Sequence, residues 1–189
     1  MRAMSIRKAH RVDAAQWLPA ERIGQMTVDA KTRPWLIGKG LLTLRLRSAY
    51  GENFSLKEVD QWTGLLSEPH QAALECDDTA GLFREVEMRC HAQVCVFAQT
   101  VMPDSTLCLY PWLAELGDSS LGETLSDLAG VERRPYEYAW LAEGDALAQR
   151  ALKDAEVKPA GLWARRSRIE LRGAPLLVHE VFMPAMGAV

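Results

Sequence analysis

Two charged residues occupy sequence positions that direct them among apolar neighbours. Arg84 alternates in phase with the apolar residues at 86, 88 and 90, and Glu180 does so with those at 176, 178 and 182. A charge on the apolar face of a strand is costly unless it has a partner or a ligand. A guanidinium can hold a carboxylate through two hydrogen bonds, and burial makes a carboxylate a better base. These residues predict a polar site in a mostly apolar cavity, unless they only pair with each other or Glu180 faces solvent.

Other groups able to do chemistry are less well placed. Cys90, His91 and Cys95 could meet as metal ligands across a turn, but both cysteines have the phase of an apolar strand face, where thiols are common. No GxSxG motif surrounds any serine, and Gly38-Lys39-Gly40 lacks the rest of a phosphate-binding loop. The four cysteines include no CxxC pair, so we expect no bound metal. In a chain of 189 residues without a signal peptide, we expect them to be free thiols.

The elements that must position Arg84 and Glu180 are two predicted strand hairpins. Alternating apolar residues predict strands over 84–90, 93–101, 163–171 and 176–183. The turn of the second hairpin is Arg172-Gly173-Ala174-Pro175. The same alternation predicts a half-buried strand at 41–47, with Leu42, Leu44 and Leu46 on one face, and a further strand begins at Phe54 and runs to 59.

Helices are expected between the two hairpins. The apolar stretch 107–116 is closed by Gly117, a shorter piece covers 120–125, and an Ala-rich stretch covers 141–157. Strand pairs joined by short turns, with helices grouped between them, predict an α+β fold on a single antiparallel sheet.

Composition places the chain among soluble proteins of one domain. Its 189 residues carry 22 Lys and Arg against 25 Asp and Glu, a net charge of −3. The length suits one domain of about 100–200 residues, and the near-neutral balance argues against nucleic-acid binding, which favours a basic stripe. The N-terminus shows no apolar stretch typical of a secretory signal, and no run of 18 apolar residues occurs. We expect a cytoplasmic protein without stable membrane insertion.

One long segment is similar to a known family. The residues from Gly161 to Pro184 read GLWARRSRIELRGAPLLVHEVFMP, and this ordered pattern resembles the C-terminal hairpin of the chorismate lyase family. Shorter segments follow in matching order: Trp35-Leu36 with Leu41-Leu42-Thr43, Arg84-Glu85-Val86, Thr100-Val101-Met102-Pro103, and Leu116-Gly117 with Ser120-Leu121-Gly122. The resemblance covers about residues 35–184. It implies a lyase-like domain over 35–189, with 1–34 as an N-terminal extension of it.

The resemblance implies a reaction and a site. The family cleaves chorismate into 4-hydroxybenzoate and pyruvate without metal or organic cofactor, the first committed step of ubiquinone biosynthesis. Its ligand is buried beneath short helical flaps on an antiparallel sheet. By resemblance, Arg84 holds the benzoate carboxylate, Glu180 meets the para-hydroxyl, and backbone groups near Leu42 and Leu121 line the same pocket. A monomer is also expected on this basis.

The sequence departs from the family in three respects. Leu41 replaces a polar residue beside the pocket, and the stretch 140–157 is longer than in compact members, as a surface helix or an enlarged lid. No residue is assigned to the enolpyruvyl carboxylate, although Arg165 is a candidate. A different class of function is a non-catalytic module that binds an aromatic acid, because the fold also resembles effector-binding domains of winged-helix regulators. A winged helix needs about 70 residues, and only 34 precede Trp35.

Overall fold

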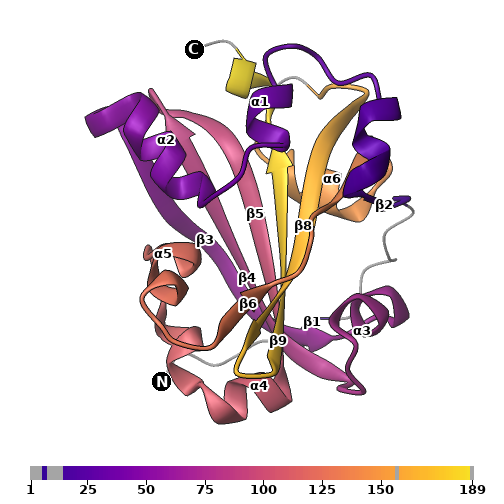
Figure 1. Ribbon diagram of the computed structural model, residues 1–189, viewed down its shortest axis with the longest axis vertical. Coiled ribbons are helices and arrows are strands. Elements are labelled where there is room, and N and C mark those ends of the chain that lie inside the picture. The colour runs from indigo at the N-terminus through magenta and orange to yellow at the C-terminus, as the bar shows by residue number, and fades with distance from the viewer. Residues whose placement is uncertain (1–5, 8–14, 156–157, 188–189) are drawn as a thin grey trace.

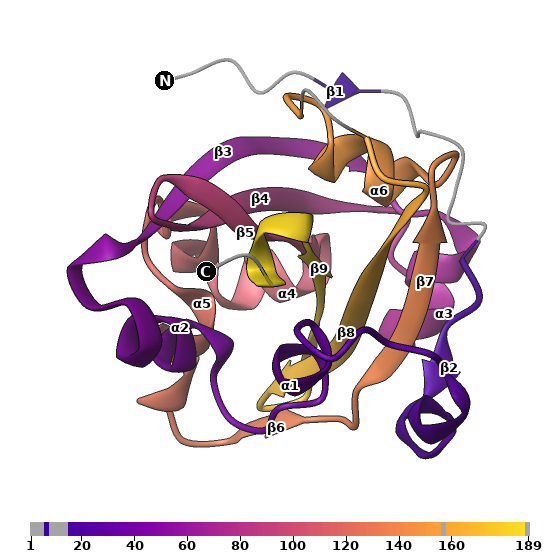
Figure 2. The same ribbon diagram turned by 90° about the horizontal axis from the view of Figure 1, so that it is seen from above.

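The protein is built on one curved sheet that carries helices on both faces (Figures 1 and 2). The computed structural model describes residues 6–7, 15–155 and 158–187. Nine strands occur in this part of the chain: β1 (Ile6–Arg7), β2 (Leu18–Pro19), β3 (Phe54–Leu65), β4 (Ala80–Cys90), β5 (Gln93–Pro103), β6 (Val131–Arg133), β7 (Glu137–Ala142), β8 (Gly161–Leu171) and β9 (Ala174–Phe182). Their order is β1-β3-β4-β5-β9-β8-β7-β2, and β6 pairs with β8. All pairs are antiparallel except the short pair of β1 with β3.

Both predicted hairpins are confirmed, within a few residues at their ends. The β4–β5 loop consists of His91 and Ala92, with φ of 49° and 67°, and the β8–β9 loop of Arg172 and Gly173, with φ of 50° and 88°. Two-residue loops with positive φ at both positions match the right-handed twist of the strands that they join. The strand predicted at 54–59 is confirmed as the first half of β3.

Helices cover the two faces of the sheet differently. The α-helices are α1 (Arg33–Leu36), α2 (Leu42–Tyr50), α3 (Glu68–Leu74), α4 (Asp104–Leu109), α5 (Leu121–Ser126) and α6 (Ala146–Ala151), and the 3₁₀ turns are η1 (Ala20–Gln25), η2 (Gly51–Asn53), η3 (Pro111–Glu115) and η4 (Pro184–Gly187). Apolar residues of α1, α2, η3 and α5 pack on one face, together with those of η4. Residues of α3 and α6 pack on the other (Figure 2). The predicted α+β architecture on an antiparallel sheet is confirmed.

The strand predicted at 41–47 is wrong, because this segment forms α2. Leucines at every second position also recur one helical turn apart, so a short apolar run fits both periods. In the helix, Leu42 and Leu46 are buried against the sheet while Leu44 is 49% exposed. The packing of Leu42 and Leu46 against the sheet therefore favours the helix over the strand.

The predicted helix at 107–116 is interrupted. It divides into α4 and η3 at Pro111, whose ring removes a backbone donor and excludes a continuous helix. Gly117 follows with φ of +51°, a conformation that favours glycine. The helix predicted at 120–125 is confirmed as α5, which begins where the Ser120 side chain accepts a hydrogen bond from the Glu123 N–H.

The stretch 141–157 is helical only in its middle. Leu141 belongs to β7, and α6 begins after Asp145, whose carboxylate caps the N–H groups of residues 147 and 148. Residues 156–157 lie outside the described residues. Arg150 of α6 donates to the buried carboxylate of Glu85, on the sheet face away from α2 and α5. The described part of this stretch therefore does not form a lid on the sheet face that carries α2 and α5.

Candidate functional site

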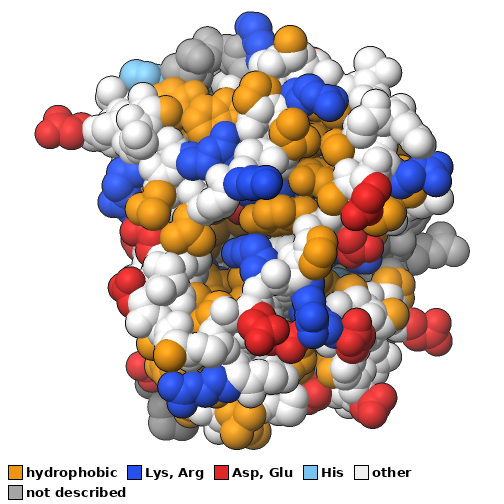
Figure 3. All heavy atoms as spheres, in the orientation of Figure 1, with side chains coloured by type: hydrophobic (Ala, Val, Ile, Leu, Met, Phe, Trp, Pro, Cys, Tyr) orange, Lys and Arg blue, Asp and Glu red, His pale blue; other side chains and the backbone are white. Residues whose placement is uncertain are grey.

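A small cavity lies between the sheet and the helices α2 and α5. Its volume is about 50 Å³, and Figure 3 shows a hollow near the middle of this face, with basic side chains beside it. Three charged side chains line it, Arg84, Arg133 and Glu180, in a wall completed by Leu41, Leu42, Thr43, Leu56, Val86, Met88, Ala98, Thr100, Ser120, Leu121, Gly122, Tyr136 and Val178. The cavity can thus bind a ligand that is partly apolar and partly charged.

Strand register brings Arg84 and Glu180 to the same face of the sheet. Arg84 on β4 lies opposite Thr100 on β5, and Thr100 lies opposite Val178 on β9, two residues before Glu180. Two strand spacings and a shift of two residues place the Cα atoms about 12 Å apart. Side chains that converge from this separation can hold the two ends of one small ring.

Arg84 is fixed by backbone carbonyls and one carboxylate. It is 2% exposed. Its Nη2 donates to the carbonyl oxygens of Gly117 at 2.7 Å and Ser119 at 2.8 Å, and its Nε lies 3.2 Å from a carboxylate oxygen of Glu58. Burial lowers the pKa of Arg84 more than Glu58 raises it. Its Nη1 makes no hydrogen bond among the described residues, so this donor remains for a ligand.

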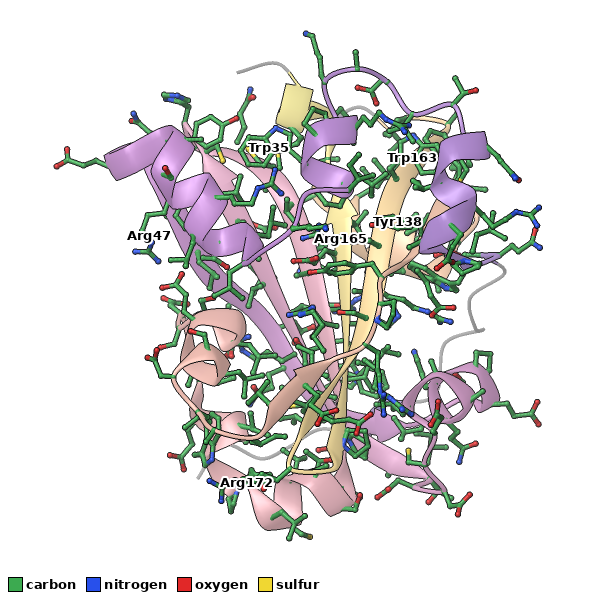
Figure 4. The ribbon with its side chains drawn as sticks, in the orientation of Figure 1. Trp35, Arg47, Tyr138, Trp163, Arg165 and Arg172 are labelled. Carbon is green, nitrogen blue, oxygen red and sulfur yellow. The ribbon has the colours of Figure 1, made fainter. Side chains whose placement is uncertain are left out.

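Glu180 is held by Arg165 from the neighbouring strand. The two residues lie opposite each other on β8 and β9, and Arg165 Nε donates to Glu180 Oε2. Arg165 Nη1 also donates to the carbonyl oxygens of Leu36 and Gly38, each at 3.0 Å, so the end of α1 helps to hold the Arg165 side chain in place. Figure 4 shows Arg165 over the sheet, below α1 in this view. Burial lowers and Glu180 raises the pKa of Arg165, with a net upward shift.

These contacts show that Arg84 and Glu180 each have a different ionic partner. Arg84 pairs with Glu58 and Glu180 pairs with Arg165, so they do not pair with each other. Glu180 is 7% exposed and does not face bulk solvent. Arg165 has no exposed surface and does not line the cavity, which argues against it as the partner of a second ligand carboxylate.

Leu42 and Leu121 mark the helices that close the cavity. They are the first residues of α2 and α5, so the N–H groups of each first turn lack partners within the helix. The helices are joined by a hydrogen bond of 3.0 Å between Thr43 Oγ1 and Ser120 Oγ. Arg47 extends from α2 toward Glu123 of α5, 3.2 Å away (Figure 4). These two contacts link α2 and α5 over this side of the cavity.

Sequence reasoning missed several residues of the cavity wall, among them Arg133 and Tyr136. Arg133 ends the three-residue strand β6, and Tyr136 precedes β7. The Tyr136 ring lies 4.3 Å from the guanidinium of Arg165, and burial raises its pKa. A strand of three residues carries no readable alternation, and Tyr136 lies between two strands, so strand phase gave no signal for either residue.

The other candidate groups form no site in the described part of the chain. All four cysteines are free thiols, as expected. No three His, Cys, Asp or Glu side chains among the residues in view are grouped so that they could hold a metal ion. In that same part, no helix has both the length and the apolar character needed to cross a membrane.

Comparison with known proteins identifies relatives over nearly the whole chain. The family model described as chorismate lyase matches residues 11–187. A probable chorismate pyruvate-lyase of Nitrosospira multiformis is 33% identical over 180 residues, covering 93% of this chain and 98% of the relative. One of Pseudomonas putida is 36% identical over 180 residues, covering 92% and 90%.

Solved structures share the fold at low identity. The effector domain of PhnF from Mycobacterium smegmatis has a TM-score of 0.56 and 16% identity, covering 79% of this chain and 92% of that one. A GntR-family transcriptional regulator from Bacillus cereus has a TM-score of 0.53 and 11% identity, covering 71% and 94%. At these identities the likeness concerns the fold alone.

Proposed function

The chain belongs to the chorismate lyase family, and from this premise we propose that it is the lyase that converts chorismate into 4-hydroxybenzoate and pyruvate. The observation that carries the proposal is the joint presence of Arg84 and Glu180 in the wall of one small, mostly apolar cavity. We further propose that the reaction needs no cofactor, occurs in the cytoplasm on a monomer, and supplies 4-hydroxybenzoate for ubiquinone.

The reaction is an elimination that makes the ring aromatic. The C3–O bond to the enolpyruvyl group breaks, the proton on C4 is removed, and the C4–H electron pair enters the ring. The enolpyruvate that leaves takes up a proton and becomes pyruvate. Because aromatisation supplies much of the driving force, the protein mainly has to position the substrate, exclude water and complement its charge.

Arg84 is suited to hold the carboxylate on the ring. Its Nη1 is available to a ligand, and the carbonyls of Gly117 and Ser119 fix the plane of the guanidinium. A planar guanidinium that is fixed in this way orients a carboxylate, and the ring attached to it, more narrowly than an ammonium group would.

Glu180 is suited to act at the other end of the ring. One of its oxygens accepts from Arg165, and the other makes no hydrogen bond among the described residues. Glu180 can therefore orient the C4 hydroxyl or accept the C4 proton. Leu42 and Leu121, at the starts of α2 and α5, present backbone N–H groups to the same ligand.

The first experiment is to incubate the purified protein with chorismate alone. We expect 4-hydroxybenzoate and pyruvate in equal amounts, measured by chromatography and a coupled pyruvate assay. We expect R84A to lose turnover and to keep its circular dichroism spectrum. The control is R89A, on the same strand, because the Arg89 side chain is 40% exposed and, among the described residues, pairs only with Glu87 and a loop carbonyl.

A non-catalytic aromatic-acid sensor is the second candidate, because the fold resembles effector domains of regulators. A sensor needs the arginine that binds the anion but not Glu180. Chorismate that is bound and remains intact after prolonged incubation would support the sensor and contradict the lyase. An R84A variant that unfolds would show that Arg84 has a structural role instead.

A further inference from the structure

The arginines around the cavity differ in how their charge is compensated. Arg84 pairs with Glu58, and Arg165 pairs with Glu180. Arg133, which also lines the cavity, has no carboxylate within ion-pair distance among the described residues. The cavity wall therefore carries one positive charge that no described acidic side chain compensates.

The guanidinium of Arg133 is nevertheless held in place. Its Nη1 donates to Ser167 Oγ, and Ser167 is 2% exposed. The guanidinium carbon lies 5.4 Å from the centroid of the Tyr136 ring, which also lines the cavity. Pairing of β6 with β8 places Arg133 opposite Ile169 and anchors its backbone. Its remaining donors make no hydrogen bond among the described residues and stay available to a ligand.

From this geometry we propose that Arg133 binds the enolpyruvyl carboxylate of chorismate, an inference that rests on the proposed function. Chorismate carries two carboxylates, and Arg84 accounts for only the one on the ring. A second guanidinium in the wall can hold the other through a charge-assisted hydrogen bond. Arg133 thus takes the role for which Arg165 was a candidate.

The proposal separates substrate from product. After cleavage, 4-hydroxybenzoate keeps the ring carboxylate, whereas the second carboxylate leaves with pyruvate. Arg133 should therefore strengthen the binding of chorismate and not that of 4-hydroxybenzoate. Arg84 should strengthen the binding of both.

The test compares R133Q, R84A and the wild type. We expect R133Q to raise the KM for chorismate by about 10- to 100-fold, because this is the usual loss of affinity when a hydrogen bond to a charged group is removed. The Kd for 4-hydroxybenzoate, measured by calorimetry, should stay within about twofold, whereas R84A should weaken it. R134Q is the matched control, because the adjacent Arg134 is exposed like Arg133 but pairs with Glu170 and does not line the cavity.

Two results would overturn the proposal: an unchanged KM in R133Q, or equal weakening of chorismate and 4-hydroxybenzoate. If R133Q does not fold, R133K carries the same comparison, with a smaller rise in KM because the charge remains without the planar fork. A wild-type protein that forms no product would instead contradict the proposed function. In that case calorimetry with chorismate and 4-hydroxybenzoate still decides whether Arg133 recognises the second carboxylate.

Discussion

Arg165 and Glu180 form an ion pair that is almost fully removed from water. Arg165 has no exposed surface, and the Glu180 side chain is 9% exposed. Arg165 Nη1 donates to the carbonyl oxygens of Leu36 and Gly38. The Arg165 guanidinium carbon lies 4.3 Å from the centroid of the Tyr136 ring and 5.6 Å from that of Phe182. The desolvation of two buried charges offsets much of their attraction. We therefore assign the pair the role of positioning the Glu180 carboxylate.

Removing Arg165 should cost more than removing an ordinary arginine. In R165M the Glu180 carboxylate loses its counter-charge, and we expect the free energy of unfolding to fall by about 3–5 kcal/mol. Urea denaturation of R165M, E180Q and the double variant tests this. The double variant should lose less than the sum of the single losses, because it leaves no unpaired charge. Additive losses would contradict a coupled pair, and R134M, which removes an exposed arginine, should cost less than about 1 kcal/mol.

At the scale of elements, the cavity is closed by two short helices rather than by the sheet. α2 has nine residues and α5 has six, lengths at which a helix depends on tertiary packing for its stability. Their direct polar links are the Thr43–Ser120 hydrogen bond and the ion pair of Arg47 with Glu123. That ion pair is largely exposed, and an exposed pair contributes little. The Thr43–Ser120 bond is therefore the stronger polar tie between them.

Weakening this tie should release the product faster. T43V keeps the shape of the side chain and removes the hydrogen bond to Ser120, which is worth about 0.5–1.5 kcal/mol. We expect the dissociation rate of 4-hydroxybenzoate, followed by stopped-flow displacement, to rise about two- to tenfold. S126A is the control, since the Ser126 hydroxyl donates to Glu123 within α5 and does not touch α2. An unchanged rate in T43V would mean that the two helices do not gate release.

At the scale of the whole molecule, the opposite face of the sheet holds two neighbouring histidines, His179, which is buried, and His70, which is half-buried. The rings of His70 on α3 and His179 on β9 have centroids 6.3 Å apart, and Trp17 lies 5.5 Å from His179. Neither ring nitrogen of His179 has a hydrogen-bond partner among the described residues. Burial, reinforced by the charge of Arg166, lowers the pKa of His70 to about 4. Burial, then His70, lowers the pKa of His179 well below its ordinary value.

These histidines should make the fold sensitive to mild acid. Both are neutral in the folded protein, whereas the unfolded chain takes up protons near pH 6.5. Between pH 6.5 and about 4 the unfolded state binds more protons, so the free energy of unfolding falls as the pH falls. Each histidine contributes a slope of about 1.4 kcal/mol per pH unit.

Urea titrations across this range measure the slope. H179L should flatten it, because one of the two groups no longer titrates. H91N should leave it unchanged, since His91 is exposed in the β4–β5 loop and asparagine tolerates its positive φ. If H179L loses stability with pH as steeply as the wild type, His179 does not contribute to the acid sensitivity.

The two hairpins, and the faces on which their side chains lie, follow from the local pattern of apolar residues. Alternation with a period of two is local, so it assigned Arg84 and Glu180 to the apolar face without knowledge of their partners. Their convergence on one cavity follows from strand order, since β5 lies between β4 and β9. The alternation could not distinguish strand from helix at 42–50, because a short leucine run satisfies both periods.

The pairing of the buried charged side chains depends on how distant elements pack together. Arg165 and the Leu36 carbonyl that it binds are 129 residues apart in the sequence, and Arg150 and Asp60 are 90 apart. No local pattern encodes such contacts, because they depend on how separate elements pack. The structure likewise brought Arg133 into the cavity from a strand too short to show a period, and it placed α6 on the far face. The face on which a strand residue lies depends on its immediate neighbours in the sequence, whereas the partner of a buried charge depends on how the whole chain folds.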